Sequence, residues 1–283
     1  MMKRILVPTD FSEEAHHAYE VAVSVARKAG TGIKLLHVVE SVSYSPSFSA
    51  TGDVLTGNNM QQVYVLQLME AMKVQMNKFL KSVDHEGVPV VQELDVDRPI
   101  SKIKRTIKED NVDLVVMGSK GSSGLDEFLI GSNTEKVVRT AECPVLTVKH
   151  RHPDFNVREV VLASDFKREV GHAMERFKSF QALFGARLHL VYINTPGAFE
   201  SSGNLFSKLE DTAKKYNLQN YSVNIYNDVI EEDGILHFAN DIRADLIMMA
   251  THGRTGLSHL LSGSIAEDLV NHTSIPVLTF QLK

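Results

Sequence analysis

Two long stretches of this sequence repeat one another. Residues 113–149 are DLVVMGSKGSSGLDEFLIGSNTEKVVRTAECPVLTVK, and residues 245–281 are DLIMMATHGRTGLSHLLSGSIAEDLVNHTSIPVLTFQ. The second stretch follows the first at a constant distance of 132 residues, so Asp113 aligns with Asp245. Each stretch holds an apolar run, a Gly-containing segment, a polar segment and a second apolar run that begins with Pro. A repeat of this length predicts two domains with the same fold.

The repeat extends to the start of each copy. Residues 5–15, ILVPTDFSEEA, resemble residues 160–170, VVLASDFKREV, and align Asp10 with Asp165 at a distance of 155 residues. The first copy therefore carries 23 extra residues, most of them in the Ser- and Gly-containing segment 41–59, which predicts a long loop. The expected domains are 1–148 and 157–283, joined by the polar, Pro-containing linker 149–156.

Strand and helix patterns alternate along each copy. The run RILVP (4–8) is almost entirely apolar, as a strand buried on both faces requires. The next residues place Ala and Val at helical spacing, with Ser12 positioned as the N-cap and Gly30 at the helix end. Further helices are expected at roughly 60–86 and from Pro99 onward. Five strands alternating with helices in each copy predict an α/β fold whose two parallel sheets carry helices on both faces.

The composition excludes several classes of protein. The chain has 283 residues, a net charge of −5, and 30 basic against 35 acidic residues. A protein that binds nucleic acid usually has an excess of basic residues, so we expect no nucleic-acid partner. No apolar run is long enough to span a membrane. The N-terminal residues do not resemble a signal peptide, and the single cysteine, Cys143, cannot form an internal disulfide. We therefore expect a cytoplasmic protein without membrane partners.

The residues that end the expected strands are the candidates for binding a ligand, because α/β sheets bind ligands beyond the carboxyl ends of their strands. Pro8, Thr9 and Asp10 follow the first strand. A Gly-2x-Gly-9x-Gly-Ser frame follows the fourth. Its candidate residues are Gly118, Lys120, Gly121, Gly131 and Ser132. Glycines allow a phosphate to approach the backbone closely, and a helix that opens at Gly131-Ser132 presents N–H groups to an anion.

The second copy keeps most of this frame. Its candidate residues are His252, Gly253, Arg254, Gly263 and Ser264, with Ala250 in place of the first glycine. A purely structural interpretation is also open. Ser132-Asn-Thr-Glu135 and Ser264-Ile-Ala-Glu267 both have the pattern of a capping box, in which the serine only starts a helix. No P-loop, dinucleotide fingerprint or zinc-binding motif occurs, so no catalytic or metal-binding residue is predicted.

The Gly frame, the strand-1 Asp in a Pro-Thr-Asp-Phe-Ser context and the terminal Pro-Val-Leu-Thr-Val strand together resemble the universal stress protein family, in both copies. The resemblance implies tandem, five-stranded, Rossmann-like domains, similar to adenine nucleotide alpha hydrolases. It also implies an ATP cofactor, with or without Mg²⁺, held at its phosphates by the Gly frame. The adenine and ribose are then expected near Asp10 and Val38 in the first copy, and near Asp165 and Ile193 in the second.

These patterns predict a stress-response protein that binds ATP and hydrolyses it slowly or not at all. The alternatives are an interaction scaffold of the same fold that binds no nucleotide, and an enzyme that acts on an adenylated substrate. The strands 144–149 and 276–281 are expected to pair, which would make the chain an internal pseudo-dimer. The sequence leaves open whether the whole chain forms a homodimer, and it names no protein partner. Loop 41–59 is expected to act either as a lid over the first site or as an insertion without function.

Overall fold

The computed structural model describes residues 2–40, 57–120, 130–166, 171–252 and 264–282. In the first half, the elements are β1 (Arg4–Pro8), α1 (Glu13–Ala29), β2 (Gly32–Glu40), α2 (Gly57–Lys81), β3 (Val90–Asp97), α3 (Pro99–Glu109), β4 (Leu114–Gly118), α4 (Ser132–Thr140) and β5 (Val145–Val148). In the second half, they are β6 (Glu159–Ala163), α5 (Gly171–Phe184), β7 (Arg187–Asn194), the 3₁₀ turn η1 (Pro196–Ala198), α6 (Ser202–Lys215), β8 (Tyr221–Asn227), α7 (Glu231–Asp241), β9 (Leu246–His252), α8 (Ser264–His272) and β10 (Val277–Leu282).

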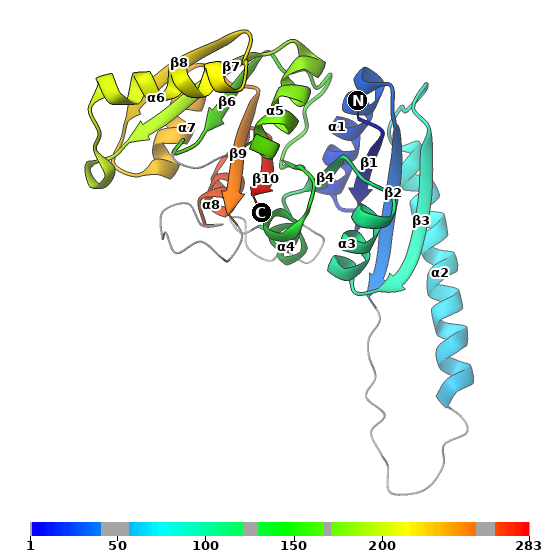
Figure 1. Cartoon of the computed structure of the whole chain (residues 1–283). Helices are drawn as coiled ribbons and strands as arrows, with labels where there is room; N and C mark the ends of the chain where they lie inside the picture. The colour runs from blue at the N-terminus through cyan, green and yellow to red at the C-terminus, as the bar shows by residue number, and fades with distance from the viewer. Residues whose placement is uncertain (1, 41–56, 121–129, 167–170, 253–263, 283) are drawn as a thin grey trace, which may run out of the picture.

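All ten strands belong to one sheet, in the order β3-β2-β1-β4-β5-β10-β9-β6-β7-β8 (Figure 1). Within each half the five strands are parallel, as the strand–helix alternation predicts. The two halves join where β5 and β10 pair antiparallel, with Leu146 opposite Leu278. The sequence predicts this pairing, but it does not reveal that the two five-stranded sheets become one continuous sheet.

Helices cover both faces of the sheet and divide the core into two layers. On one face, α1, α2, α5 and α6 bury residues that include Met76, Phe177 and Leu209. On the other face, α3, α4, α7 and α8 bury residues that include Ile107 and Leu269. The inner strands β1, β4, β5 and β6 are covered on both sides and are largely apolar in the sequence, whereas the edge strands β3 and β8 are mixed and only partly buried.

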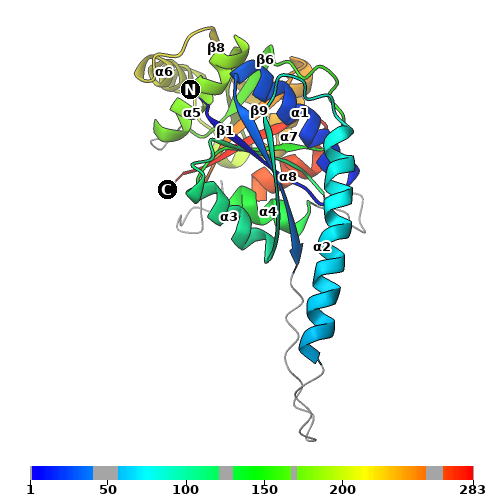
Figure 2. The ribbon, with the colours of Figure 1, turned by 90° about the vertical axis from the view of Figure 1, so that its right-hand side faces the viewer.

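The ends of α1 follow its sequence signals. The Ser12 hydroxyl accepts a hydrogen bond from the Ala15 N–H at 3.2 Å, and Gly30 adopts φ 63°, a left-handed angle that suits glycine. The second helix differs from its prediction, since α2 begins at Gly57 and ends at Lys81 rather than covering 60–86. Residues 57–59 therefore belong to a helix and not to the predicted loop, whose remaining residues lie outside the described part of the chain. Figure 2 shows the first turns of α2 extending past the body of the domain.

The junction between the halves carries a pair of matching hydrogen bonds. The Thr147 hydroxyl donates to the Val277 carbonyl at 3.1 Å, and the Thr279 hydroxyl donates to the Val145 carbonyl at 3.3 Å. Both threonines are almost fully buried. Thr147 and Thr279 are 132 residues apart and equivalent in the repeat, so the two bonds are related as the partners of a symmetric dimer would be.

The pairing leads to a prediction about the first half alone. Residues 1–148 produced without the second half should form a homodimer, because the freed β5 edge offers unpaired backbone groups and buried apolar side chains. Thr147→Lys should keep this fragment monomeric, since pairing would bring two buried ammonium groups together. Sedimentation velocity measures both outcomes. A wild-type fragment that folds and stays monomeric at high concentration would show that β5 does not drive the association.

Candidate functional site

A cavity of about 340 Å³ opens at the carboxyl ends of β1, β2 and β4. It is lined by eight of the residues singled out in the first copy, which are Pro8, Thr9, Asp10, Val38, Gly118, Lys120, Gly131 and Ser132. The ninth, Gly121, lies outside the described residues. The structure thus brings together residues from four separate segments of the chain, and these are the segments that the strand-end rule selects.

The turn after β1 fixes the direction of Asp10. The Thr9 hydroxyl accepts a hydrogen bond from the Phe11 N–H at 3.0 Å, and an Asp10 carboxylate oxygen accepts one from the Ser12 N–H at 3.1 Å. Phe11 has φ 66°, an uncommon angle for a residue with a side chain, and the two side-chain bonds stabilise it. The carboxylate of Asp10 therefore sits on a tightly defined turn at the edge of the cavity.

The second copy repeats this turn. The Ser164 hydroxyl accepts a hydrogen bond from the Phe166 N–H at 3.1 Å, and Phe166 has φ 50°. The Ser/Thr-Asp-Phe triplet is therefore a backbone motif in both halves. It explains why a hydroxyl residue precedes each aspartate.

His37 lines the cavity although the sequence analysis did not select it. Its Nδ1 lies 2.7 Å from the Thr9 carbonyl oxygen, so Nδ1 carries the proton and donates, and Nε2 keeps its lone pair. The ring packs on Phe11, with centroids 4.3 Å apart. Burial lowers the pKa of His37, and this outweighs the opposite effects of the Thr9 carbonyl and the Asp10 charge. Its position next to Val38, at a strand end, is the signal that could have found it.

The start of α4 corrects the capping-box interpretation in the first copy. Gly131, with φ −63°, is the N-cap, and no side chain caps the helix. Ser132 is the first helical residue, so its hydroxyl does not perform the capping that the sequence pattern suggests. The Gly131 N–H donates to the Ser119 carbonyl at 2.8 Å. The N–H groups that remain without an intrahelical acceptor are those of the first turn, which begins at Ser132 on the cavity wall.

Gly118 has a packing role in addition to its place in the cavity wall. A Cβ at this position would lie 2.8 Å from the Glu14 carbonyl carbon and 3.0 Å from the Ala15 nitrogen, so only glycine lets the start of α1 pack on the end of β4. The Gly118 carbonyl accepts a hydrogen bond from the buried Thr134 hydroxyl at 2.9 Å. This bond ties β4 to α4. Gly118 therefore contacts both α1, through close packing, and α4, through this hydrogen bond.

Charges of both signs border the cavity. Asp10 and Glu40 bring carboxylates, and Lys120 brings an ammonium group. The field of Lys120 also reaches Lys149, whose pKa is lowered first by burial and then by the Lys120 charge. Lys149 donates to the Asn271 carbonyl at 2.7 Å, at the C-terminal end of α8. The basic end of the first cavity is therefore linked to a helix of the second half.

The second copy is described less completely. Asp165 and Ile193 lie at the ends of β6 and β7 as expected, Ala250 and His252 are in β9, and Ser264 begins α8. Gly253, Arg254 and Gly263 lie outside the described residues. Lys208 of α6 donates to the Asp165 carbonyl at 2.7 Å and lies 5.5 Å from the centre of the Tyr192 ring.

Two polar positions of the first cavity differ in the second copy. Tyr192 takes the place of His37, and Ala266 takes the place of Thr134. The bond that joins β4 to α4 therefore has no equivalent between β9 and α8.

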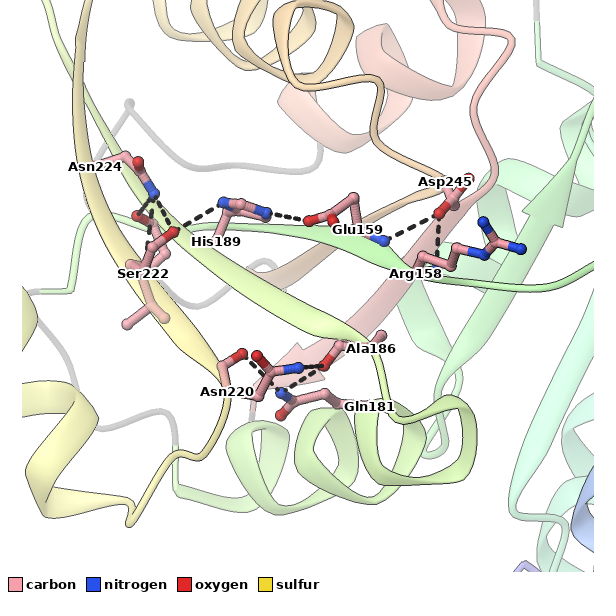
Figure 3. Close-up of polar contacts among 10 residues, drawn as sticks. Arg158, Glu159, Gln181, Ala186, His189, Asn220, Ser222, Asn224 and Asp245 are labelled. Atoms are coloured by element: carbon pink, nitrogen blue, oxygen red, sulfur yellow. Dashed lines mark hydrogen bonds and ion pairs between the residues drawn. The ribbon is translucent and has the colours of Figure 1, made fainter.

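A separate chain of polar side chains crosses β6, β7 and β8 (Figure 3). The Ser222 hydroxyl lies 2.8 Å from His189 Nδ1, and His189 Nε2 lies 2.5 Å from a Glu159 carboxylate oxygen. The Asn224 amide donates to the Ser222 hydroxyl at 3.1 Å. These residues lie toward the amino ends of their strands, whereas the cavity of the first half lies at the carboxyl ends. We assign the network to strand pairing, because it occupies the place of the ion pairs between Lys34 and Glu93 in the first half.

Comparison with known proteins identifies the family of the chain. The model of the universal stress protein family matches residues 1–149 and again residues 156–281. The chain belongs to the universal stress protein family. A universal stress protein of Synechocystis is 24% identical over 296 residues, covering 99% of this chain and 100% of the relative.

Two further proteins are similar to this chain, one over about half of its length and one over nearly all of it. A universal stress protein of Methanocaldococcus jannaschii is 31% identical over 158 residues, covering 54% of this chain and 98% of the relative. The crystal structure of a universal stress protein from Archaeoglobus fulgidus superimposes with a TM-score of 0.73 at 21% identity, over 98% of this chain and 96% of the other. The first relative matches a length of about one copy, and the second shares the tandem fold.

The described residues contain no helix long and apolar enough to cross a membrane. Within the same residues, no cluster of three His, Cys, Asp or Glu side chains could hold a metal ion. Burial raises the pKa of the Cys143 thiol to about 12, which keeps the thiol protonated and unreactive.

The packing at Gly118 gives a stability prediction. Gly118→Ala should lower the free energy of unfolding by about 1–3 kcal/mol, because the added methyl group overlaps the backbone of Glu14 and Ala15. Gly197→Ala is the matched control, since a Cβ there meets no atom within 4 Å. Urea unfolding measures both variants. Equal stabilities would mean that α1 moves away from β4 at little cost.

The buried His37 gives a pH prediction. The pKa of His37 is lower in the folded chain than in the unfolded chain, where it has its ordinary value of about 6.5. As the pH falls below about 6.5, the unfolded chain therefore binds a proton at His37 before the folded chain does. The free energy of unfolding should fall over this range. His37→Asn keeps a side-chain N–H near the Thr9 carbonyl and does not titrate, so this variant should lose less stability on acidification. Thermal unfolding between pH 7.5 and pH 5.5 measures the difference. His152, whose pKa burial also lowers, should leave part of the dependence in the variant. Identical pH profiles for wild type and variant would contradict the role given to His37.

Proposed function

We propose that the cavity of the first half binds ATP. The observation that carries this proposal is the convergence of Asp10, Val38, Lys120 and Ser132 on one cavity beside the first turn of α4. A helix start offers N–H donors and a positive dipole end to phosphate oxygens. Because Ser132 is not engaged in capping, its hydroxyl is available to an anion bound there.

The cavity wall has both polar and apolar residues, and their chemistry suggests how the nucleotide lies. The α4 start and Lys120 suit the phosphates. Val38, Ile103 and Met117 offer apolar contacts for the adenine ring, and the Asp10 carboxylate is suited to accept hydrogen bonds from ribose hydroxyls. His37 Nε2 provides one more acceptor on this wall.

The residues of the cavity also fit a magnesium ion bound together with the phosphates. Mg²⁺ prefers oxygen ligands and is commonly held by one or two carboxylates and the phosphates of its nucleotide. Asp10 and Glu40 supply such carboxylates. We propose that the bound ATP is held rather than turned over rapidly, and that the protein works in the cytoplasm as a nucleotide-dependent module of a stress response.

The second half carries a weaker case for the same function. Asp165, Ile193 and Ser264 occupy the equivalent positions, so we propose a second ATP site there. The methyl group of Ala250 and the loss of the Thr134 hydroxyl make this site the less secure of the two. The alternative function, a scaffold that binds no nucleotide, finds its support in these departures and applies first to the second half.

Calorimetric titration with ATP should give about two sites per chain. Gly131→Val should remove one site, because a branched side chain would enter the space expected for the phosphates, while φ −63° at this position accepts valine without backbone strain. Gly263→Val should remove the other. A single site that survives Gly263→Val and disappears with Gly131→Val would reduce the second half to a structural partner. No binding at all would favour the scaffold.

Ser132→Ala separates a ligand contact from a structural role. Removal of a capping serine costs about 1 kcal/mol of stability, whereas removal of a hydroxyl that contacts a phosphate weakens binding about tenfold. We expect unchanged urea unfolding and the weaker ATP affinity. Ser12→Ala is the control with the opposite pattern of stability, because Ser12 does cap its helix. A destabilised Ser132→Ala with normal ATP affinity would restore the capping interpretation.

A further inference from the structure

Three apolar side chains stand exposed at the carboxyl ends of β7 and β8. Phe199 is 76% exposed, Val229 is 75% exposed and Ile230 is 45% exposed. Phe199 follows the η1 turn after β7, and the other two residues join β8 to α7. We call these three residues the apolar patch. None of them contributes to either buried core layer.

Hydrogen bonds hold the patch in one place. The buried Asn194 side chain accepts from the Glu200 N–H at 3.0 Å and donates to the Asn227 side chain at 3.2 Å. The Asn194 backbone carbonyl accepts from the Asp228 N–H at 3.4 Å. One residue thus fixes both segments that carry the patch. The Thr195 hydroxyl adds a bond to Glu231 at 3.3 Å. The patch is therefore an ordered surface on a rigid strand end, rather than a set of side chains on a loose loop.

The apolar patch has an acidic rim. The rim consists of Glu200, Asp228, Glu231, Glu232 and Asp233, each adjacent in the chain to a patch residue or in the first turn of α7. Within the rim, His237 lies 2.7 Å from Asp228 and lowers the pKa of that carboxyl group. Acids in a first turn also stabilise their helix through its dipole, which accounts for some of the charge. The dipole does not account for the exposed Phe and Val beside them.

The first half differs at the place of Val229 and Ile230, whereas its segment aligned with Phe199 lies outside the described residues. Asp97 and Arg98 stand where the second half has Val229 and Ile230, and Pro99 stands where it has Glu231. Asp97 pairs with Arg105 at 3.0 Å. The repeat therefore preserves the fold here and changes an ion-paired, mixed surface into an apolar surface with a negative border. Such a change is unfavourable for solubility and is typical of a surface that binds a partner.

We propose that the apolar patch and its acidic rim dock a basic, amphipathic segment of a protein partner. Apolar side chains of that segment would cover Phe199 and Val229, and its Lys or Arg residues would pair with the rim. The charge of the rim selects a basic partner over an acidic one and over a second copy of this chain, whose own patch has the same negative border. This docking is independent of nucleotide binding in the first half.

The test uses the full chain and a fluorescent amphipathic peptide of Leu and Lys, about 18 residues long, which forms about five helical turns. The partner is unidentified, so this peptide serves as the probe for its chemistry. Fluorescence anisotropy gives the affinity, and the same peptide with Glu in place of Lys is the charge control. The apolar variant is Val229→Ser, and its matched control is Val91→Ser, an exposed valine in the first half. The charge variant is Glu232→Gln with Asp233→Asn, and its matched control is Glu86→Gln with Glu109→Gln.

We expect the Lys peptide to bind the wild-type chain, and binding to weaken at least tenfold in Val229→Ser and in the charge variant. Both control variants should bind as the wild type does, and the Glu peptide should not bind. Equal weakening by the control variants would overturn the proposal, because attraction by the overall charge would then explain the binding. Unchanged binding in Val229→Ser would also overturn it. So would a concentration-dependent dimer in sedimentation that Val229→Ser abolishes, since the patch would then bind a second copy. Circular dichroism checks that each variant is folded.

Discussion

The antiparallel pairing of β5 with β10 is the constraint on which the rest of the structure depends. Each half ends in a short apolar strand whose outer edge would otherwise be unpaired, and such an edge promotes association. Pairing the two edges satisfies both backbones, buries Thr147 and Thr279 with matching bonds, and produces one sheet of ten strands. It also fixes the two sets of strand ends relative to one another, because a twofold-like junction inverts one half on the other. The linker is held to the first half, since Arg151 pairs with Glu20 of α1.

Around this junction the two halves keep the backbone and vary the side chains. The Ser/Thr-Asp-Phe turn is retained with its left-handed Phe and its hydroxyl bond, because both depend on local chain geometry. The surfaces of the sheet are under weaker constraint. On one half, Lys34 pairs with Glu93 and Asp110, and on the other, His189 joins Glu159 to Ser222. Different polar groups satisfy equivalent positions, so strand pairing needs a satisfied network but not a particular one.

The sequence predicts the architecture well because the repeat, the apolar runs and the strand-end rule are all local or periodic signals. It selects seven residues of the first cavity for the same reason, and the family resemblance adds Val38. It misses His37, because a histidine inside an apolar strand gives no periodic signal, and only the fold turns its ring toward Thr9. It leaves open whether Ser132 is a cap, because the Ser-x-x-Glu pattern does not show that Gly131 is the N-cap and Ser132 the first helical residue. It does not reveal the packing role of Gly118, since the approach of Glu14 to the end of β4 cannot be seen from spacing.

The two halves differ in the residues at the carboxyl ends of their strands. In the first half, Thr134 ties α4 to the end of β4, and His37 and Lys120 line the cavity. The second half replaces Thr134 and His37 by Ala266 and Tyr192, and exposes Phe199 and Val229 beside an acidic helix start. A duplicated domain needs only one copy of each activity, so the second copy is free to acquire another surface while the shared sheet keeps both copies folded. The junction at β5 and β10 joins the two halves into one sheet, so the cavity of the first half and the exposed apolar residues of the second half belong to one continuous structure.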